Sequence, residues 1–344
     1  MEKDTIAVIL AAGEGTRMKS SAPKVLHKLC GTPIINYSLN TTSKLSFIKE
    51  TLVILGHKAE EVKKTLPSNV KTILQREQLG TGHALMQIKN ALGDFKGNIL
   101  VLCADAPLLT VETLEKLYQT HKKQNASATI LTSVINNPKG YGRVTRNNEG
   151  MVVKIVEELD ATPSEKNINE INTSIYCFKW EDLHQALNNL KLNQEKGEYY
   201  LTDCIENFIK DQLVVASLKT EDPNEALGIN NRIHLSKAEN RIREQILNNL
   251  MLQGVTILDP NSTFVDQEVK IEQDTIIYPY TSIMGNTVIE SKCVIGPFSC
   301  IINSEIENEC TVFSSFIVNS HIERNSSIGP YDYFKNSQQV KLGE

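Results

Sequence analysis

The chain has 344 residues, of which 40% are hydrophobic and 22% are charged, an ordinary composition for a globular protein. Its length favours about two domains. The 36 basic and 41 acidic residues give a formal net charge of −5. Because nucleic-acid-binding proteins usually carry a basic excess, this balance argues against a nucleic acid as partner.

Three further features favour a cytoplasmic protein. No apolar run approaches the roughly 20 residues of a membrane-spanning helix, so we expect no membrane span. The first residues lead directly into a strand-like run and lack the pattern of a secretory signal. The 7 cysteines are odd in number and form no Cys-x-x-Cys pair, which is typical of reduced thiols and not of disulfides or a zinc site.

Residues 1–228 are predicted to form one α/β domain. Short continuous apolar runs at residues 6–10, 51–55 and 99–103 are typical of parallel strands that helices cover on both faces. Helical patterns lie between these runs, so we expect an open, mostly parallel, Rossmann-like sheet. Ligands of such sheets bind at the carboxyl ends of the strands.

The middle of this domain contains more strand-like runs, at residues 128–134, 152–157 and 171–178. We interpret them as extra strands and a flap over the sheet edge. Residues 229–253 are predicted to form a connecting helix, which marks the domain boundary. Its apolar stripe would be Ile233, Ile242, Ile246 and Leu250, and Gly254 would end it.

Residues 254–330 follow a different period. Six isoleucines fall six residues apart from Ile271 to Ile301, and a small residue stands four positions after each of the first five. This repeat predicts a short left-handed parallel β-helix of roughly four coils, in which each hexad is one side of a triangular coil. The isoleucines would point inward and the small residues would occupy the corners. A β-sandwich is the less favoured alternative, and residues 331–344 would be a C-terminal tail.

Residues 10–18, which read LAAGEGTRM, follow the first apolar run, and Pro23 and Lys24 stand just beyond. A glycine-containing loop with two cations at the end of a strand suits a nucleotide, because Arg17 and Lys24 can neutralise phosphate charge. It is not a complete dinucleotide fingerprint, since Met18 stands where the third glycine belongs. On these residues alone, a surface turn with solvated cations is an equal alternative.

This loop resembles the signature of the sugar-1-phosphate nucleotidyltransferases. Five further segments narrow the resemblance to the bacterial bifunctional N-acetylglucosamine-1-phosphate uridyltransferase/glucosamine-1-phosphate acetyltransferase family. They read QREQLGTGHA at residues 75–84, GYGR at 140–143, EINT at 170–173, GEYYLTD at 197–203 and GINNR at 228–232. Their order and spacing agree with the family from residue 6 to about 330.

The resemblance implies Mg²⁺-dependent uridylyl transfer from UTP to N-acetylglucosamine-1-phosphate. It implies that Arg17 and Lys24 are catalytic and that Asp105 and Asn230 bind Mg²⁺. The nucleotide-binding residues would be Leu10, Ala11, Ala12, Gly13, Gln75, Gln78, Gly80 and Thr81. The sugar-binding residues would be Gly142, Glu157, Asn172, Tyr200 and Thr202. His83, at the start of a helix, is interpreted as structural.

Each of these assignments has a structural alternative. Asp105 could cap the turn before Pro107, and Asn230 with Asn231 could cap the helix that follows. Tyr200 could be a core aromatic residue. Glu157 and its neighbour Glu158 could form a solvated pair.

The sequence also departs from the family. Ala104 stands where the family usually has glycine, and Leu159 stands where it often has lysine. Residues 331–339 lack the arginine-containing family segment, and the acetyltransferase constellation has no counterpart. We therefore expect no acetyltransferase activity, in a chain that is either naturally monofunctional or a shortened form.

Three other functions compete with this interpretation. The same chemistry with another sugar phosphate or nucleotide is the nearest, because fold alone does not fix the substrate. A non-catalytic regulatory subunit with the same pairing of domains is the second, but such a subunit would not need Arg17, Lys24, Asp105 and Asn230 together. An acyltransferase, suggested by the hexads, is the weakest.

The β-helix is also expected to assemble the protein. Family members pack three such prisms about a threefold axis, and apolar or aromatic residues stand at solvent-side positions here, namely Tyr278, Tyr280, Met284, Phe298, Phe313 and Phe316. We expect a homotrimer through the repeats. The alternative is a monomer in which residues 331–344 cap the open coil.

Overall fold

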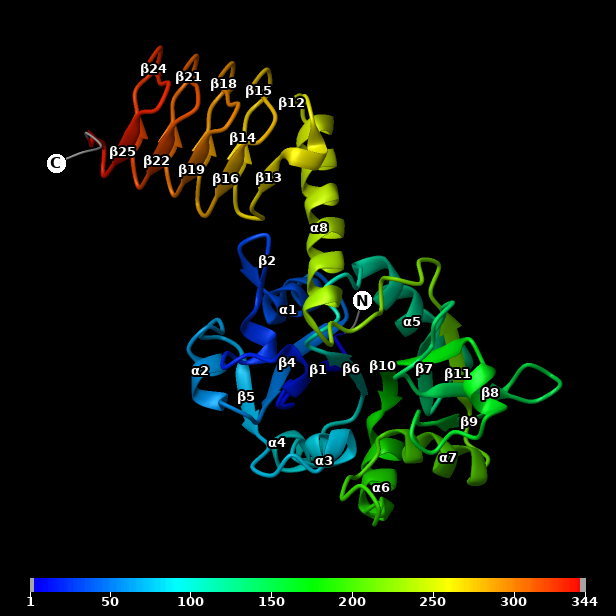
Figure 1. Ribbon diagram of the computed structural model, residues 1–344. Helices are drawn as coiled ribbons and strands as arrows, with labels where there is room; N and C mark the ends of the chain where they lie inside the picture. The colour runs from blue at the N-terminus through cyan, green and yellow to red at the C-terminus, as the bar shows by residue number, and fades with distance from the viewer. Residues whose placement is uncertain (1–2, 341–344) are drawn as a thin grey trace. The chain divides into compact units, whose positions relative to one another are not determined.

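The computed structural model describes residues 3–340, which form two compact units (Figure 1). Their boundary lies between His234 and Leu235, inside the helix α8 (Arg232–Leu252), the segment that was expected to connect the domains. Residues 28–32 also belong to the second unit, because the Cys30 N–H donates to Glu239 Oε1 at 3.1 Å and the Gln267 N–H donates to Cys30 O at 2.9 Å. This hairpin, β2 (Lys28–Leu29) and β3 (Thr32–Pro33), was not expected there.

A mixed sheet forms the centre of the first unit. Within residues 3–340 it has nine strands, with β11-β7-β10-β6-β1-β4-β5 in spatial order and the hairpin β8–β9 beside β10. The strands are β1 (Thr5–Ala11), β4 (Ile48–Leu55), β5 (Lys71–Leu74), β6 (Asn98–Cys103), β7 (Ala128–Val134), β8 (Arg143–Arg146), β9 (Val152–Val156), β10 (Glu170–Lys179) and β11 (Val215–Lys219). β10 runs antiparallel to both β6 and β7, whereas the other pairs along this path are parallel. The expected mostly parallel sheet is therefore confirmed.

The interpretation of this region as extra strands and a flap over the sheet edge is wrong for β7 and β10. β10 lies between β6 and β7 in the sheet and is buried along most of its length, because helices cover both of its faces. Only the hairpin β8–β9 lies off the main path of the sheet, where β8 pairs with β10 through Arg143 and Ile171.

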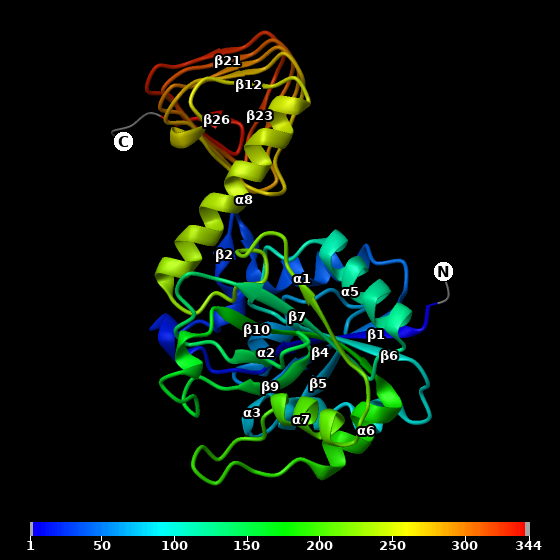
Figure 2. The ribbon, with the colours of Figure 1, turned by 90° about the vertical axis from the view of Figure 1, so that its right-hand side faces the viewer.

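Helices pack on both faces of this sheet, as Figure 2 shows. Alternate strand residues divide between two cores, so that Val8 faces one layer of helices and Ile9 the other. One layer contains α1 (Ile34–Ser43), α2 (Ala59–Lys63) and α5 (Val111–Gln124), and the other contains α3 (Gly80–Met86), α4 (Lys89–Leu92), α6 (Trp180–Asn189) and α7 (Thr202–Lys210). Both cores contain residues from the apolar runs that predicted the strands.

The helix α8 extends over the range predicted for the connecting helix, and Gly254 follows it with a φ of +96°, a left-handed conformation that favours glycine. Ile242 and Leu250 are buried as expected, but Ile233 is 66% exposed. The predicted stripe is therefore wrong at Ile233, whereas Leu250, together with Leu247, belongs to the core of the repeat unit. No helix within residues 3–340 is both long and apolar enough to cross a membrane.

The repeat unit consists of three parallel sheets that wind into stacked coils. Their strands are β12 (Thr256–Ile257), β13 (Phe264–Val265), β14 (Lys270–Ile271), β15 (Ile276–Ile277), β16 (Ser282–Met284), β17 (Val288–Ile289), β18 (Val294–Ile295), β19 (Cys300–Ile302), β20 (Glu305–Ile306), β21 (Thr311–Val312), β22 (Phe316–Val318), β23 (His321–Ile322), β24 (Ser327–Ile328), β25 (Tyr333–Lys335) and β26 (Gln338–Gln339). The isoleucines of the hexads are buried, and so are the small residues Thr275, Thr281, Thr287, Cys293 and Ser299. The prediction of stacked hexad strands is confirmed.

The hexad spacing slips after Ile301 because the corners become shorter. Three residues, 285–287, join β16 to β17, but only residues 303–304 join β19 to β20 in the next coil. The strands on either side keep their pairing, with Ile283 beside Ile301 and Ile289 beside Ile306. A corner can therefore lose a residue without changing the core.

The stack continues beyond residue 330, where we had expected a tail to begin. β25 pairs in parallel with β22, and β26 turns back to pair antiparallel with β25. This happens because Phe334 follows Ile317 in register and packs against the end of the core. Residues 341–344 of the expected tail lie outside the described residues.

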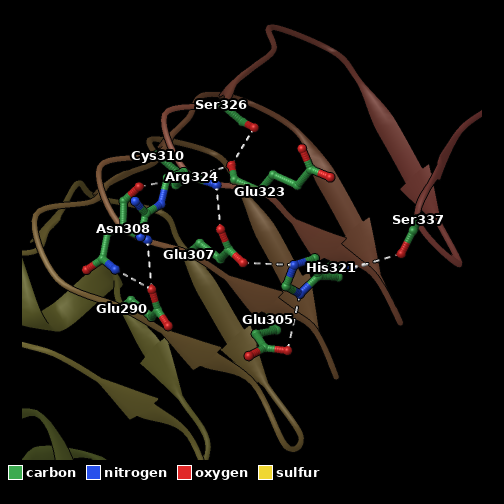
Figure 3. Close-up of polar contacts among 10 residues, drawn as sticks. All are labelled: Glu290, Glu305, Glu307, Asn308, Cys310, His321, Glu323, Arg324, Ser326 and Ser337. Carbon is green, nitrogen blue, oxygen red and sulfur yellow. Dashed lines mark hydrogen bonds and ion pairs between the residues drawn. The ribbon is translucent and has the colours of Figure 1, made fainter.

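Polar side chains outside the coils link each coil to the next (Figure 3). Glu290 Oε2 accepts a hydrogen bond from the Asn308 N–H at 3.0 Å, and one coil later Glu307 Oε2 accepts one from the Arg324 N–H at 2.8 Å. The ring of His321 lies between two carboxylates, 3.2 Å from Glu305 and 3.1 Å from Glu307. These contacts repeat with the coil and satisfy backbone donors at its corners.

Candidate functional site

A pocket of about 570 Å³ opens where β1 and β6 end. It is lined by residues from six segments of the first unit, which include residues 10–17, 75–84 and the turn after β6. Among them are all the expected nucleotide-binding residues and all four expected catalytic and metal-binding residues, namely Leu10, Ala11, Ala12, Gly13, Gln75, Gln78, Gly80, Thr81, Arg17, Lys24, Asp105 and Asn230. The parallel strands place this pocket at their carboxyl ends, as predicted.

The loop after β1 folds so that its two cations approach the same place. Gly15 has a φ of +66°, and a Cβ atom there would lie 2.5 Å from Lys24 Cβ, so this position requires glycine. Met18, where a dinucleotide fingerprint would have its third glycine, is buried and anchors the loop in the domain. The loop therefore differs from that fingerprint in structure as well as in sequence.

The cations meet two oxygen ligands in the pocket. The Lys24 ammonium contacts Asp105 Oδ2 and donates to Asn230 Oδ1 at 3.3 Å, while Arg17 donates to the same Asn230 oxygen at 2.9 Å. The loop that carries Asn230 is fastened to the loop that carries Asp105, because the Ile229 N–H donates to Asp105 O at 2.8 Å. Residues more than 200 positions apart in the sequence are thus brought together.

These contacts bear on the capping roles that were the alternatives for Asp105 and Asn230. The Asp105 carboxylate contacts Lys24 across the pocket, so it does more than hold the turn before Pro107. Helix capping falls to Asn231, whose Oδ1 accepts a hydrogen bond from the His234 N–H at 2.9 Å. Asn230 is left to face the cations.

The donor set fits a magnesium ion. One carboxylate oxygen and one amide oxygen already face a common cation, the Lys24 ammonium. Magnesium prefers hard oxygen ligands and often takes only one or two from protein, with phosphate and water supplying the rest. Within residues 3–340 no group of three or more His, Cys, Asp or Glu residues could hold a metal ion, so a more protein-rich site is absent there.

The two glutamines are oriented by the segment that carries them. Gln75 is buried and its Nε2 donates to Gly80 O at 3.1 Å, while Gln78 Nε2 donates to Gln75 O at 3.0 Å. His83 Nδ1 lies 3.1 Å from Gln75 Nε2 and 2.9 Å from Glu77 O. His83 thus supports the glutamine segment through its hydrogen bonds, and it does not line the pocket.

A smaller pocket of about 170 Å³ adjoins the first and shares Leu10, Thr81 and Glu198 with it. Three expected sugar-binding residues line it, namely Glu157, Tyr200 and Thr202. The other two stand beside it. Asn172 Nδ2 donates to the Tyr176 hydroxyl at 2.7 Å, and Tyr176 lines the pocket. A Cβ atom on Gly142 would lie 3.3 Å from Glu157 Oε2.

The neighbouring acidic residues Glu157 and Glu158 have different environments, and only Glu157 lines this pocket. Burial raises the pKa of Glu157, although the Thr202 hydroxyl donates a hydrogen bond to it at 3.1 Å. Burial also raises the pKa of Tyr200 to about 12, so its hydroxyl stays protonated at neutral pH. Glu158 instead pairs with Arg143 at 2.7 Å, so the interpretation of Glu157 and Glu158 as one solvated pair is wrong. Tyr200 faces the pocket and is only partly buried.

The structure adds residues that the sequence did not single out. Glu198 lines both pockets, and Ser174 and Tyr176 line the smaller one. Tyr176 lies on β10 with Asn172, and the alternation of that strand could have identified it. Glu198 belongs to the segment GEYYLTD at residues 197–203, which carried the family resemblance, but the sequence assigned no role to this glutamate.

The two departures from the family lie in different surroundings. Ala104 is fully buried in the core next to the pocket, where its methyl group packs with the helices on that face. Leu159 is 71% exposed, and the structure gives no reason for a leucine there.

Comparison with known proteins agrees with this architecture. The nucleotidyl transferase family matches residues 6–223, and the bacterial transferase hexapeptide family (six repeats) matches residues 268–303. This chain is 45%, 46% and 44% identical to the proteins named Bifunctional protein GlmU from Acetivibrio thermocellus, Pelotomaculum thermopropionicum and Clostridioides difficile, respectively. The alignments cover 98%, 99% and 98% of this chain and 74%, 75% and 74% of those relatives. From this similarity along nearly its whole length, the chain belongs to the GlmU family of nucleotidyltransferases with C-terminal hexapeptide repeats.

Proposed function

We propose that the protein is a Mg²⁺-dependent uridylyltransferase that converts UTP and N-acetylglucosamine-1-phosphate into UDP-N-acetylglucosamine and pyrophosphate. The observation that best supports this proposal is the meeting of Arg17, Lys24, Asp105 and Asn230 in one pocket beside a smaller polar pocket. The first pocket suits a nucleoside triphosphate, and the second suits a sugar.

The proposed reaction is a direct transfer at the α-phosphorus of UTP. An anionic oxygen of the sugar phosphate forms the new P–O bond, and the bond to pyrophosphate breaks with its electron pair leaving on pyrophosphate. Because the attacking oxygen is already charged, the reaction needs no protein nucleophile or general base. Arg17 and Lys24 neutralise the phosphate charge, and the pockets align the two substrates.

Asp105 and Asn230 would hold the magnesium ion. When bound, the ion would help to neutralise the charge of the phosphates and to orient them. Support for this assignment comes from the two oxygen ligands that already face one cation.

The substrate assignment rests on the polar groups of the two pockets. The amides of Gln75 and Gln78 offer both donors and acceptors, which suits the edge of uracil. In the smaller pocket, Glu157, Tyr200 and Thr202 offer hydrogen-bonding partners for hydroxyl groups and an acetamido group. The nearest alternative is another sugar-1-phosphate, because a shared fold does not determine the substrate.

A substrate panel tests the proposal. Pyrophosphate release would be measured with UTP and N-acetylglucosamine-, glucosamine-, glucose- or galactose-1-phosphate, with and without Mg²⁺. We expect the highest kcat/KM with N-acetylglucosamine-1-phosphate, and no turnover after chelation of the metal. A clear preference for another sugar would move the proposal to that substrate. An absence of pyrophosphate release with every sugar phosphate would favour the non-catalytic alternative.

The proposal includes a homotrimer assembled through the repeats. Aromatic side chains stand exposed on the coils, and Tyr280 and Phe298 stack in parallel with their ring centroids 5.1 Å apart. Such patches often mark interfaces. Light scattering should give three times the chain mass of 38.4 kDa. The double variant Tyr280→Ser and Phe298→Ser should lower that mass, whereas a monomeric wild type at micromolar concentration would rule the trimer out.

Acetyl transfer remains a separate prediction. We expect this 344-residue chain to release no free thiol from acetyl-CoA in the presence of glucosamine-1-phosphate. A rate that rises with protein concentration would contradict the expectation.

A further inference from the structure

A buried arginine lies beside the smaller pocket without lining it. Arg143, the first residue of β8, is 1% exposed and is among the largest fully buried side chains of the described residues. Its Nε atom has no hydrogen-bond partner within those residues. Burying a charged group with an unpartnered donor costs stability. The other two guanidinium nitrogens do have partners, and these contacts indicate what the residue does.

Those contacts fasten one short segment at both ends. The Arg143 guanidinium donates to Tyr141 O and pairs with Glu158 at 2.7 Å. Burial alone would raise the pKa of Glu158, but a hydrogen bond from the Gly140 backbone and the pairing with Arg143 lower it, so the carboxylate stays charged. Arg143 and Glu158 together thus hold the segment from Gly140 to Gly142.

The held segment lies beside the smaller pocket, between Glu157, which lines that pocket, and Asn172. Arg143 on β8 stands opposite Val156 on β9, and Glu157 is the residue that follows Val156. On the other side, the Asn172 N–H donates to Gly142 O at 2.9 Å. Gly142 is therefore placed between Glu157 and Asn172, close enough that an added Cβ would lie within 3.6 Å of both side chains.

The same segment also approaches the cation cluster. Burial raises the pKa of Tyr141, and the charges of Asp105 and Arg17 act on it as well. Because Gly142 stands between Glu157 and Asn172, a shift of residues 140–142 would disturb the side of the smaller pocket that Glu157 lines. An error of about 1 Å in such a position can cost a large factor in rate.

We propose that Arg143 is a positioning residue for sugar binding, which acts through Glu158 and the segment 140–142 and does not touch the substrate. This inference rests on the proposed function, because it takes the smaller pocket as the sugar site. A buried ion pair retained for a specific conformation is consistent with its poor contribution to stability.

Steady-state kinetics of the full-length chain test this role. For Arg143→Met, we expect the KM for N-acetylglucosamine-1-phosphate to rise by about tenfold or more and the KM for UTP to change by less than about twofold. Arg143→Lys should lie between the wild type and Arg143→Met, since lysine keeps the charge but lacks the planar fork that reaches two acceptors. Arg146→Met is the matched control. Arg146 lies on the same strand, but its ion pair, 2.5 Å long, is with Glu170 and does not involve the segment 140–142. This variant should leave both KM values unchanged.

The outcomes separate the inference from the function on which it rests. If the wild type releases no pyrophosphate with N-acetylglucosamine-1-phosphate, the proposed function fails and the inference fails with it. If the wild type is active and Arg143→Met raises both KM values equally, or neither, then Arg143 is only structural and the inference is overturned. Should Arg143→Met not fold, Glu158→Gln must show the same selective rise in the KM for the sugar phosphate. An unchanged ratio of KM values in Glu158→Gln would reject the inference.

Discussion

The two units of this protein bury their apolar residues by different rules. In the α/β unit, adjacent residues such as Val8 and Ile9 point to opposite faces of one sheet, and helices from distant parts of the chain cover each face. In the repeat unit, every sixth residue from Ile271 to Ile301 enters one shared core. The first arrangement depends on long-range contacts, whereas each coil of the second contacts mainly its neighbouring coils.

This difference coincides with where the candidate site lies in the chain. Strand ends and loops of the α/β unit bring Arg17, Asp105 and Asn230 into one pocket. The coils instead repeat the same contacts, as Glu290 and Glu307 do when each accepts a backbone hydrogen bond from the next coil. We therefore expect substitutions in the first unit to change turnover and substitutions in the second to change stability or assembly.

The largest effect is expected at Asp105. Asp105→Asn should lower kcat/KM by about 10³ or more, because the metal site loses its carboxylate. Thermal unfolding should stay close to that of the wild type. Asp211→Asn, at an exposed position after α7, is the control for loss of an acidic charge. Wild-type turnover of Asp105→Asn at low Mg²⁺ would remove this residue from the site.

Somewhat smaller losses are expected at the two cations. Arg17→Ala and Lys24→Ala should each lower kcat/KM by about 10², since each removes charge stabilisation of the transferring group. Lys19→Ala, an exposed lysine of the same loop, should have little effect. A rise of only a few-fold in the KM for the sugar phosphate would show that the cations attract substrate and do not stabilise the transition state.

In the repeat unit we expect a loss of stability without a loss of turnover. Ile295 is fully buried, so Ile295→Ala should lower the free energy of unfolding by about 2–5 kcal/mol. The kcat/KM of the folded protein should stay within about twofold of the wild type. Val294→Ala changes the neighbouring, partly exposed side chain and should cost much less in denaturant unfolding. Equal losses for the two variants would contradict the inward position of Ile295.

The smallest effect concerns pH. Hydrogen bonding to Glu305, with support from Glu307, raises the pKa of His321 above its ordinary value. The folded state therefore binds this proton more tightly than the unfolded state, and the stabilisation is present at low pH and lost as the pH rises through the folded pKa. The difference in Tm between wild type and His321→Gln should shrink from about pH 5.5 to about pH 8.5. A constant difference would show that the proton is not involved.

The sequence reveals these two units to different degrees. The hexads are a local pattern, so the inward isoleucines and small corner residues could be predicted one by one. The apolar run of β10 predicted a strand, but not its antiparallel direction or its place between β6 and β7, because a buried run does not encode its neighbours. The hairpin at Cys30 was missed for the same reason, since its partner Glu239 is 209 residues away.

The site shows the same limit. Composition and spacing alone suggested only that the loop at residues 10–18 could meet phosphate, and the link to Asn230 came from the family resemblance. Arg143 and Glu158 received no role, because a buried ion pair depends on the register between β8 and β9. Residues that position others leave little trace in a single sequence.

The shortened corners of the stack have a practical consequence for protein engineering. Ile283, Ile301 and Ile317 stay in register along the stack. The corner that follows β16 contains residues 285–287, whereas the corresponding corner after β19 contains only residues 303–304. The cost of closing a loop grows slowly with its length. A short epitope or labelling peptide inserted beside the exposed Asn286 should therefore be accommodated, and it would mark the repeat unit.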